Sequence, residues 1–190
     1  MKKLDNVGVF IRGLSYSKDN VTSDKNDTLV LRSNNICEDK TLDYVTGLQF
    51  VNKKPKSEQA LIKNDIVICM ANGSNRLVGK AAQYDGNYFN SITVGAFCGI
   101  FRCDLPIIQY IFQSPDYTNF LLLNLQGGDG AIANLKGEDI LNFSTLFPCL
   151  EEQRKIADFL SAYDEAISYA KQELDKWKEL KKGLLQQMFV

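Results

Sequence analysis

The chain of 190 residues contains no histidine. Imidazole general-base chemistry is therefore excluded, as is every metal site in which histidine shares the ligands. The cysteines show no Cys-x-x-Cys spacing and stand mostly in apolar stretches. We therefore expect buried, reduced thiols, with neither disulfide bonds nor a metal bound by the chain. The cysteines are Cys37, Cys69, Cys98, Cys103 and Cys149.

Long apolar runs are also missing. The longest, at 66–71 and 120–123, are far shorter than the roughly 20 residues that cross a bilayer as a helix. The basic start at 1–3 is followed by Leu4-Asp5-Asn6 rather than by the apolar segment of an export signal. We therefore expect a cytoplasmic protein with no membrane partner.

An excess of positive charge is missing from both parts of the chain. From Glu151 onward seven Lys or Arg stand against eight Asp or Glu, and fifteen of each kind occupy residues 1–150. Binding to a nucleic acid needs Lys and Arg that face its phosphates. A chain of this composition can therefore bind DNA only through a local patch of Lys and Arg or with the help of a partner.

The first 147 residues have the pattern of a compact mixed domain. Hydrophobic residues make up 45% of the chain, which is enough for a real core. Short apolar stretches, separated by Gly, Asn and Asp, predict strands. These strands are expected at 28–32, 65–70, 77–82, 92–102 and 141–147.

Two helices are predicted between the last two of these strands. Asp104 can cap a helix that begins at Leu105-Pro106, and Ser114-Pro115 repeats the signal for a second helix that runs to about residue 125. Proline suits the first helical position because the N–H that it lacks has no partner there in any case. We therefore expect an α/β (α+β) domain over residues 1–147.

From residue 148 onward one helical pattern runs to the end of the chain. Its apolar residues recur at alternating steps of four and three, which is a heptad seam with Lys181 as its one charged member. About 38 helical residues extend roughly 57 Å, which is too long for the stripe to be buried against so small a domain. The apolar members are Ile156, Leu160, Tyr163, Ile167, Ala170, Leu174, Trp177, Leu184 and Met188.

This stripe needs a partner helix, and we expect residues 148–190 to form a long coiled-coil helix. The alternative is a helix that lies flat along its own domain, which explains the stripe but not its length. Gly183 costs about 1 kcal/mol in a helix interior, so the helix is expected to end near Lys182.

The helical region and three upstream stretches carry a family resemblance. LFPCLEEQRKIADFLSAYDEAI, followed by LDKWKELKKGLLQQMFV, resembles the conserved helical region of the specificity subunits of type I restriction-modification systems. IRGLSYSKDNV, IKNDIVICMANGSNRLVGKAA and GGDGAIANLKGEDI resemble landmarks of a target recognition domain. Cys149 departs from the family pattern, which often has a second proline there. Members usually carry two recognition domains and two helical regions, so this chain resembles a half subunit.

The resemblance implies a division of labour. Residues 1–147 would be a target recognition domain that reads one half of a bipartite target in double-stranded DNA. Residues 148–190 would be a spacer that docks the methyltransferase (modification) subunits, with the restriction subunits joining through the complex. Self-association through antiparallel helices would supply the second domain and predicts a palindromic target. The chain itself would bind no cofactor, and S-adenosylmethionine, ATP and Mg²⁺ are expected on the partner subunits.

Two polar segments have the chemistry for contacts with DNA. Arginine can bond bidentately to guanine and asparagine to adenine, and Ser, Lys or Tyr can hold phosphates. For the segment 72–76 the alternative is an ordinary Asn-Gly-Ser hairpin turn. The candidates are Arg12, Tyr16, Ser17 and Lys18 in the first segment, Asn72, Ser74, Asn75 and Arg76 in the second, and Lys80 and Tyr84 beyond it.

Two stretches suggest catalysis but have simpler explanations. SPDY, at 114–117, superficially resembles the motif with which amino-methyltransferases hold a flipped base. It lacks the second proline, and no Gly-rich strand-turn-helix precedes it for S-adenosylmethionine, so a helix cap is favoured. GGDG, at 127–130, lacks the Gly-Lys-Ser/Thr ending of a phosphate loop and is expected to be a plain turn.

We therefore expect a non-catalytic subunit that recognises a DNA sequence within a type I restriction-modification complex. The alternative is a coiled-coil assembly adaptor that no longer reads DNA, and the neutral charge favours it. A mobility shift of DNA, with the chain alone and then with a methyltransferase subunit, discriminates between the two.

Overall fold

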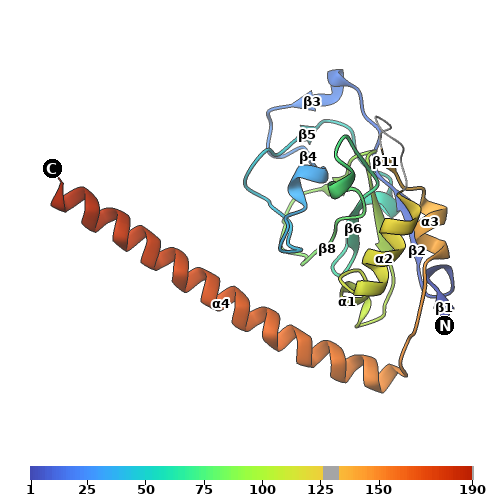
Figure 1. The fold of residues 1–190 in the computed structure, drawn as a ribbon. Coiled ribbons are helices and arrows are strands. Elements are labelled where there is room, and N and C mark those ends of the chain that lie inside the picture. Colours follow the sequence, from blue (N-terminus) through green and yellow to red (C-terminus); the bar gives the residue numbers. More distant parts are fainter. Residues whose placement is uncertain (126–132, 190) are drawn as a thin grey trace. The chain divides into compact units, whose positions relative to one another are not determined.

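The computed structural model describes residues 1–125 and 133–189 (Figure 1). The chain divides into two units, Met1–Phe147 and Pro148–Val190. The first is a mixed α/β domain, and the second contains one long helix. The roles that the sequence suggests for the two units stay predictions.

A four-stranded antiparallel sheet with the order β2-β10-β6-β8 lies at the centre of the first unit. In its register Arg12 pairs with Gly99, and Cys98 pairs with Cys69. Every residue of β6 is buried, which explains its unbroken apolar sequence. The bounds are Val9–Arg12 for β2, Ile66–Cys69 for β6, Ala81–Gln83 for β8 and Cys98–Arg102 for β10.

Both faces of this sheet are buried because successive side chains of a strand point to opposite sides. From β6, Ile66 and Ile68 enter one hydrophobic cluster, whereas Val67 and Cys69 enter another. Residues of three helices complete the first cluster, and residues of a second sheet complete the other. The helices are α1 (Ile108–Ile111), α2 (Pro115–Asn124) and α3 (Gly137–Asn142).

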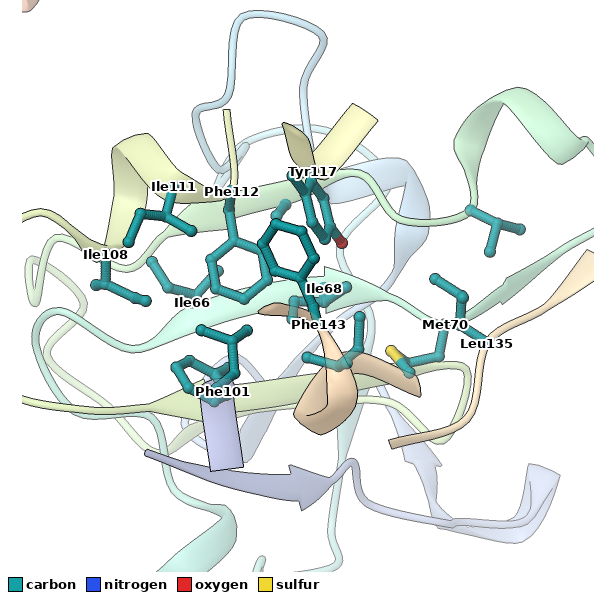
Figure 2. Close-up of a cluster of buried hydrophobic side chains, with 14 of the residues drawn as sticks. Ile66, Ile68, Met70, Phe101, Ile108, Ile111, Phe112, Tyr117, Leu135 and Phe143 are labelled. Carbon is teal, nitrogen blue, oxygen red and sulfur yellow. The ribbon is translucent and has the colours of Figure 1, made fainter. Parts of the chain in front are cut away.

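Aromatic rings form the centre of the first cluster (Figure 2). The ring of Tyr117 lies 4.9 Å from that of Phe112 and 5.5 Å from that of Phe143, both edge to face. Although Tyr117 is only 2% exposed, its hydroxyl donates a hydrogen bond of 3.0 Å to the carbonyl of Gly79. The buried polar atom thus has a partner, and it ties α2 to the loop before β8.

The second sheet has the order β3-β5-β4-β9, with β4 and β9 parallel and the other pairs antiparallel. Leu29 and Leu31 of β4 face the central sheet, whereas Val30 packs with Leu14 and Val51 on the other side. The bounds are Val21–Thr22 for β3, Thr28–Leu31 for β4, Phe50–Val51 for β5 and Ile92–Val94 for β9. Two short pairs join β1 (Lys2–Lys3) to β12 (Ser144–Thr145) and β7 (Ala71–Asn72) to β11 (Ala133–Asn134).

The structure confirms some of the predicted elements and corrects others. Ser114 caps α2 by accepting a hydrogen bond from the Tyr117 N–H at 3.2 Å, so the cap interpretation of SPDY is confirmed. The cap predicted at Asp104 is wrong, because α1 begins only at Ile108. The Gly127–Gly130 stretch lies outside the described residues.

Three predicted strands have different forms in the structure. The expected strand at 92–102 is two strands, since residues 95–97 turn the chain between β9 and β10. The expected strand at 77–82 begins as a 3-10 turn, Asn75–Leu77, and pairs only from Ala81. Most of 141–147 is not a strand, because α3 runs to Asn142 and only Ser144–Thr145 pairs.

All five cysteines are free, but they are not all buried. Cys69 and Cys98 are buried, Cys37 and Cys103 are half-buried, and Cys149 is exposed. The prediction of a buried thiol is therefore wrong for Cys149. In the described part of the chain, no helix is long and apolar enough to span a membrane.

The second unit consists of α4, Leu150–Met188, a helix of 39 residues and about 58 Å. At its start the Glu152 carboxylate accepts a hydrogen bond of 3.0 Å from the Cys149 N–H, which satisfies one of the backbone donors left over at a helix start. The predicted end near Lys182 is wrong, since the helix continues through Gly183. The cost of one glycine is small compared with the good helix formers around it.

One ion pair with a buried carboxylate joins the ends of the two inner strands of the central sheet. Arg102, at the end of β10, donates to both carboxylate oxygens of Asp65, from Nε at 2.8 Å and from Nη2 at 2.7 Å. The Asp65 side chain is 1% exposed and also accepts from the Ile62 N–H at 2.9 Å. Arg102 Nη2 further donates to the Ala60 carbonyl at 2.8 Å. The pair therefore holds the loop before β6 against β10.

Replacing Arg102 with alanine should lower the free energy of unfolding by about 3–5 kcal/mol, because it leaves a buried carboxylate without its cation. Urea unfolding of the full chain measures this loss. Adding Asp65→Asn should recover part of it, since a neutral amide oxygen can still accept from the Ile62 N–H. Lys155→Ala, which breaks an exposed pair with Glu151, is the matched control and should have little effect. Equal losses in Arg102→Ala and Lys155→Ala would contradict the prediction.

Candidate nucleic-acid interface

Four chain segments that follow strand ends enclose a cleft of about 650 Å³. They are residues 14–16 after β2, 32–34 after β4, 71–73, which include β7, and 95–98, which run from the turn after β9 into the start of β10. We call this hollow the Tyr16 cleft. Its walls come from both sheets, so the packing of one sheet on the other sets its width.

Backbone hydrogen bonds fasten these segments to one another. The Leu14 N–H donates to the Val94 carbonyl at 2.7 Å, and the Gly95 N–H donates to the Leu31 carbonyl at 2.8 Å. This close approach requires glycine at position 13, where a Cβ atom would lie 2.1 Å from the Gly95 carbonyl oxygen. The walls of the cleft are thus backbone segments held in place before any ligand arrives.

Two of the predicted DNA-binding residues, Tyr16 and Asn72, line the Tyr16 cleft. Tyr16 is half-buried and packs against the apolar cluster of Leu14, Val30 and Val51. Asn72 donates from Nδ2 to Ser33 Oγ at 2.9 Å, and its Oδ1 accepts from the Ser74 N–H at the same distance. Asn72 therefore fastens two walls together, and its amide is engaged within the protein.

The cleft also contains two residues that the sequence analysis missed, Arg32 and Phe97. Arg32 donates from Nη2 to the Gly47 carbonyl at 2.7 Å, whereas its Nε is buried without a hydrogen-bond partner among the described residues. Phe97 is 71% exposed. The turn at 95–97 brings Phe97 to the cleft, and the Gly95-Ala96 pair inside an apolar run was its only sequence signal.

A second hollow of about 310 Å³ is lined by Glu38, Lys40, Ser74, Arg76, Leu77 and Lys80. We call it the basic hollow, because it has three cationic side chains and one carboxylate. Three of the predicted DNA-binding residues, Ser74, Arg76 and Lys80, meet here. Lys40 was not predicted, since it comes from a distant turn in which its φ of 67° is left-handed. The basic hollow is the kind of local patch that a chain without excess positive charge needs to hold a phosphate.

Three other predicted residues, Arg12, Ser17 and Lys18, line neither hollow. Arg12 and Lys18 are exposed, and Asn75 lies in the 3-10 turn Asn75–Leu77. Ser17 caps the 3-10 turn Lys18–Asn20, with its N–H bonded to Asn20 Oδ1 at 3.0 Å.

Tyr84 cannot take part in binding, because its side chain is 3% exposed. Its ring packs with that of Tyr44, 6.4 Å away, in the cluster between the sheets. Burial raises the pKa of Tyr84, so its hydroxyl stays neutral. The prediction of a DNA contact for Tyr84 is corrected accordingly.

The titratable groups near the cleft do not provide a nucleophile. Burial raises the pKa of the Cys69 thiol to about 11 and also raises the pKa of Cys98, which lines the cleft. A thiol with a raised pKa is protonated at neutral pH and unreactive. Among the described residues, no group of Cys, Asp and Glu side chains has the arrangement of a metal site.

The predicted seam of α4 is open to solvent. Leu160 is half-buried, and the other eight apolar residues of the seam are exposed. Two further exposed apolar residues, Phe159 and Leu180, lie beside the seam.

Comparison with known proteins decides the family. The sequence profile of the type I restriction modification DNA specificity domain matches residues 1–179. The chain belongs to this family. The specificity subunit of the type I restriction enzyme StySPI from Salmonella potsdam is 30% identical over 187 residues, and that of EcoKI from Escherichia coli (strain K12) is 31% identical. Each match covers 95% of this specificity-domain chain and 39% of the relative, so the chain spans about two fifths of the length of these relatives.

Solved structures show the same fold in this family. The HsdS subunit from Thermoanaerobacter tengcongensis matches with a TM-score of 0.59 and 15% identity, over 90% of this chain and 38% of that one. The S subunit of a type I restriction-modification system from M. genitalium gives a TM-score of 0.57 and 17% identity, over 86% of this chain and 38% of that one. The specificity-domain fold, a mixed α/β domain followed by a long helix, is therefore confirmed.

Proposed function

We propose that this chain is the DNA-recognition subunit of a type I restriction-modification complex and reads one half of a bipartite target. The observation that carries this proposal is the Tyr16 cleft beside the basic hollow, on a chain of the specificity-domain family. The matched relatives are specificity subunits of type I restriction enzymes, and a single recognition domain would read one half-site.

In this proposal α4 sets the distance between two recognition domains and also binds the methyltransferase subunits. A second copy would pair with it in antiparallel fashion and so bring a second recognition domain about a two-fold axis. The methyltransferase subunits would dock on the same helix. Its apolar face supports more than one partner, because Phe159, Ala166 and Leu180 widen the seam at one heptad position, which only Glu173 interrupts. Three apolar positions per heptad suit a helix bundle, whereas two suit a simple coiled coil.

The reactions would then belong to the partners. The methyltransferase and restriction subunits would hold S-adenosylmethionine, ATP and Mg²⁺, and this chain would bind no cofactor. The restriction subunits would join through the complex, which we place in the cytoplasm. This chain would determine the DNA sequence at which the complex binds.

The second candidate function is a coiled-coil assembly adaptor that no longer reads DNA. The balance of 22 Lys and Arg against 23 Asp and Glu favours it, because non-specific DNA binding depends on excess positive charge. A mobility shift decides between the two. The full chain is mixed with a pool of duplexes of random sequence, alone and then with a type I methyltransferase subunit. Enrichment of particular sequences supports the recognition subunit, and complex formation without any retained DNA supports the adaptor.

Replacing Leu174 with aspartate should abolish self-association, because it places a charge in the centre of an apolar interface at a cost of several kcal/mol. Light scattering should show the mass of a monomer, and binding to the methyltransferase subunit should weaken. Tyr169→Asp is the matched control, since Tyr169 is exposed on α4 but lies away from the seam. Unchanged mass and unchanged methyltransferase binding in Leu174→Asp would remove this role from α4.

Inserting one heptad between Ala170 and Leu174 should lengthen the spacer of the recognised DNA. The insertion keeps the seam in register and adds about 10 Å, or roughly three base pairs at about 3.4 Å each. Selection over a graded set of spacers should recover the same half-site sequences a few base pairs farther apart. A four-residue insertion is the control, because it breaks the register and should prevent pairing. If the heptad variant pairs yet keeps the original spacing, α4 does not set the distance.

A further inference from the structure

Phe97 is an exposed aromatic ring on a rigid backbone. Its carbonyl accepts hydrogen bonds from the Met70 N–H at 2.8 Å and the Ala71 N–H at 3.1 Å, and the Cys98 N–H closes the turn on the Gly95 carbonyl at 2.8 Å. The side chain is nevertheless 71% exposed at the Tyr16 cleft. The fold thus fixes the backbone that carries this ring without using the ring in its core, which is the arrangement expected of a contact residue.

Arg32, which lines the cleft, has one donor without an acceptor among the described residues. Arg32 Nε is buried and has no hydrogen-bond partner among the described residues, while Nη2 of the same side chain is held by the Gly47 carbonyl. A buried donor without an acceptor is costly, so the guanidinium of Arg32 beside the cleft is incompletely satisfied. An apolar ring and an arginine side chain therefore line the same cleft.

The Tyr16 cleft and the basic hollow are joined by one short stretch of chain. Residues 71–73 form a wall of the cleft, and Ser74 and Arg76 line the hollow. Asn72 fixes this stretch from both ends, through Ser33 Oγ and the Ser74 N–H. A ligand that fills both hollows must present an anionic group next to a partly apolar edge with acceptors. Duplex DNA has this combination, with the phosphate beside the edges of the bases.

We infer that the two hollows divide the work of half-site recognition, an inference that rests on the proposed function. The basic hollow holds a backbone phosphate through Lys40, Arg76 and Lys80, and sets the position of the domain without regard to sequence. The Tyr16 cleft receives a base edge, with Arg32 donating to an acceptor and Phe97 against an apolar group. The thymine methyl is the apolar group that bases present in the major groove, so Phe97 selects thymine at one position of the half-site.

The test begins with the duplex that the wild-type chain enriches from a random pool, compared with a scrambled duplex. Phe97→Ala should lower the preference for the selected duplex about five- to tenfold, the loss expected for one apolar contact. Replacing each thymine of the half-site with uracil, which lacks the methyl group, should weaken wild-type binding by a similar factor at one position. The same uracil should not weaken Phe97→Ala further. Phe89→Ala is the matched control, since Phe89 is fully exposed and lines neither hollow.

The basic hollow gives a different signature. Lys40→Ala and Arg76→Ala should weaken the selected and the scrambled duplex alike and should each flatten the dependence of binding on salt. Wild-type preference in Phe97→Ala, or a loss of methyltransferase binding with DNA preference intact, would overturn the inference and leave the proposed function standing. A wild-type chain that prefers no duplex, with or without the methyltransferase subunit, would overturn both.

Discussion

The burial of both faces of the central sheet is the constraint on which the rest of the domain depends. Because Ile66 and Ile68 face the helices while Val67 and Cys69 face the second sheet, neither face is left for a ligand. Polar and exposed residues can then gather only where strands end. The Tyr16 cleft lies there, between segments that follow β2, β4 and β6. The layers of the core fix those strand ends, and so the shape of the cleft follows from the packing.

Elements with local signals could be predicted from the sequence, whereas those set by distant contacts could not. Ser114-Pro115 carries its own cap, and the heptad seam specifies α4 without reference to the rest of the chain. The turn at 95–97 interrupts an apolar run because the Phe97 carbonyl binds the Met70 and Ala71 N–H groups of another strand end. The sequence predicted a strand at 141–147, but α3 runs to Asn142, with Ile140 packed in the first cluster, and only Ser144–Thr145 pairs.

The residues of the candidate site could likewise be predicted only in part. Side-chain chemistry pointed to Tyr16, Asn72 and Arg76, but it could not tell an engaged amide from a free one, and Asn72 is engaged. Lys40 and Arg32 reach the two hollows from other parts of the chain, so no spacing in the sequence marks them. The prediction for Tyr84 was wrong because its burial depends on a residue far away in the sequence. Its neighbours in the sequence are polar, yet it packs against Tyr44 from a distant loop.

The balance of positive and negative residues and the exposed apolar seam of α4 have a common explanation under the proposed function. Three cations in the basic hollow neutralise few phosphates, so one domain alone should bind DNA weakly and with little non-specific affinity. Two weak domains held at a fixed distance behave differently, because the second contact becomes intramolecular and gains from its high effective concentration. Affinity then depends on both half-sites being present at the correct spacing. A strongly basic domain would lose this discrimination, since it would hold any sequence through phosphates alone. Weak half-site binding and an exposed apolar helix are thus consistent with each other. Pairing of the helices would raise the affinity for the complete DNA target, so each domain can bind its half-site weakly and remain specific.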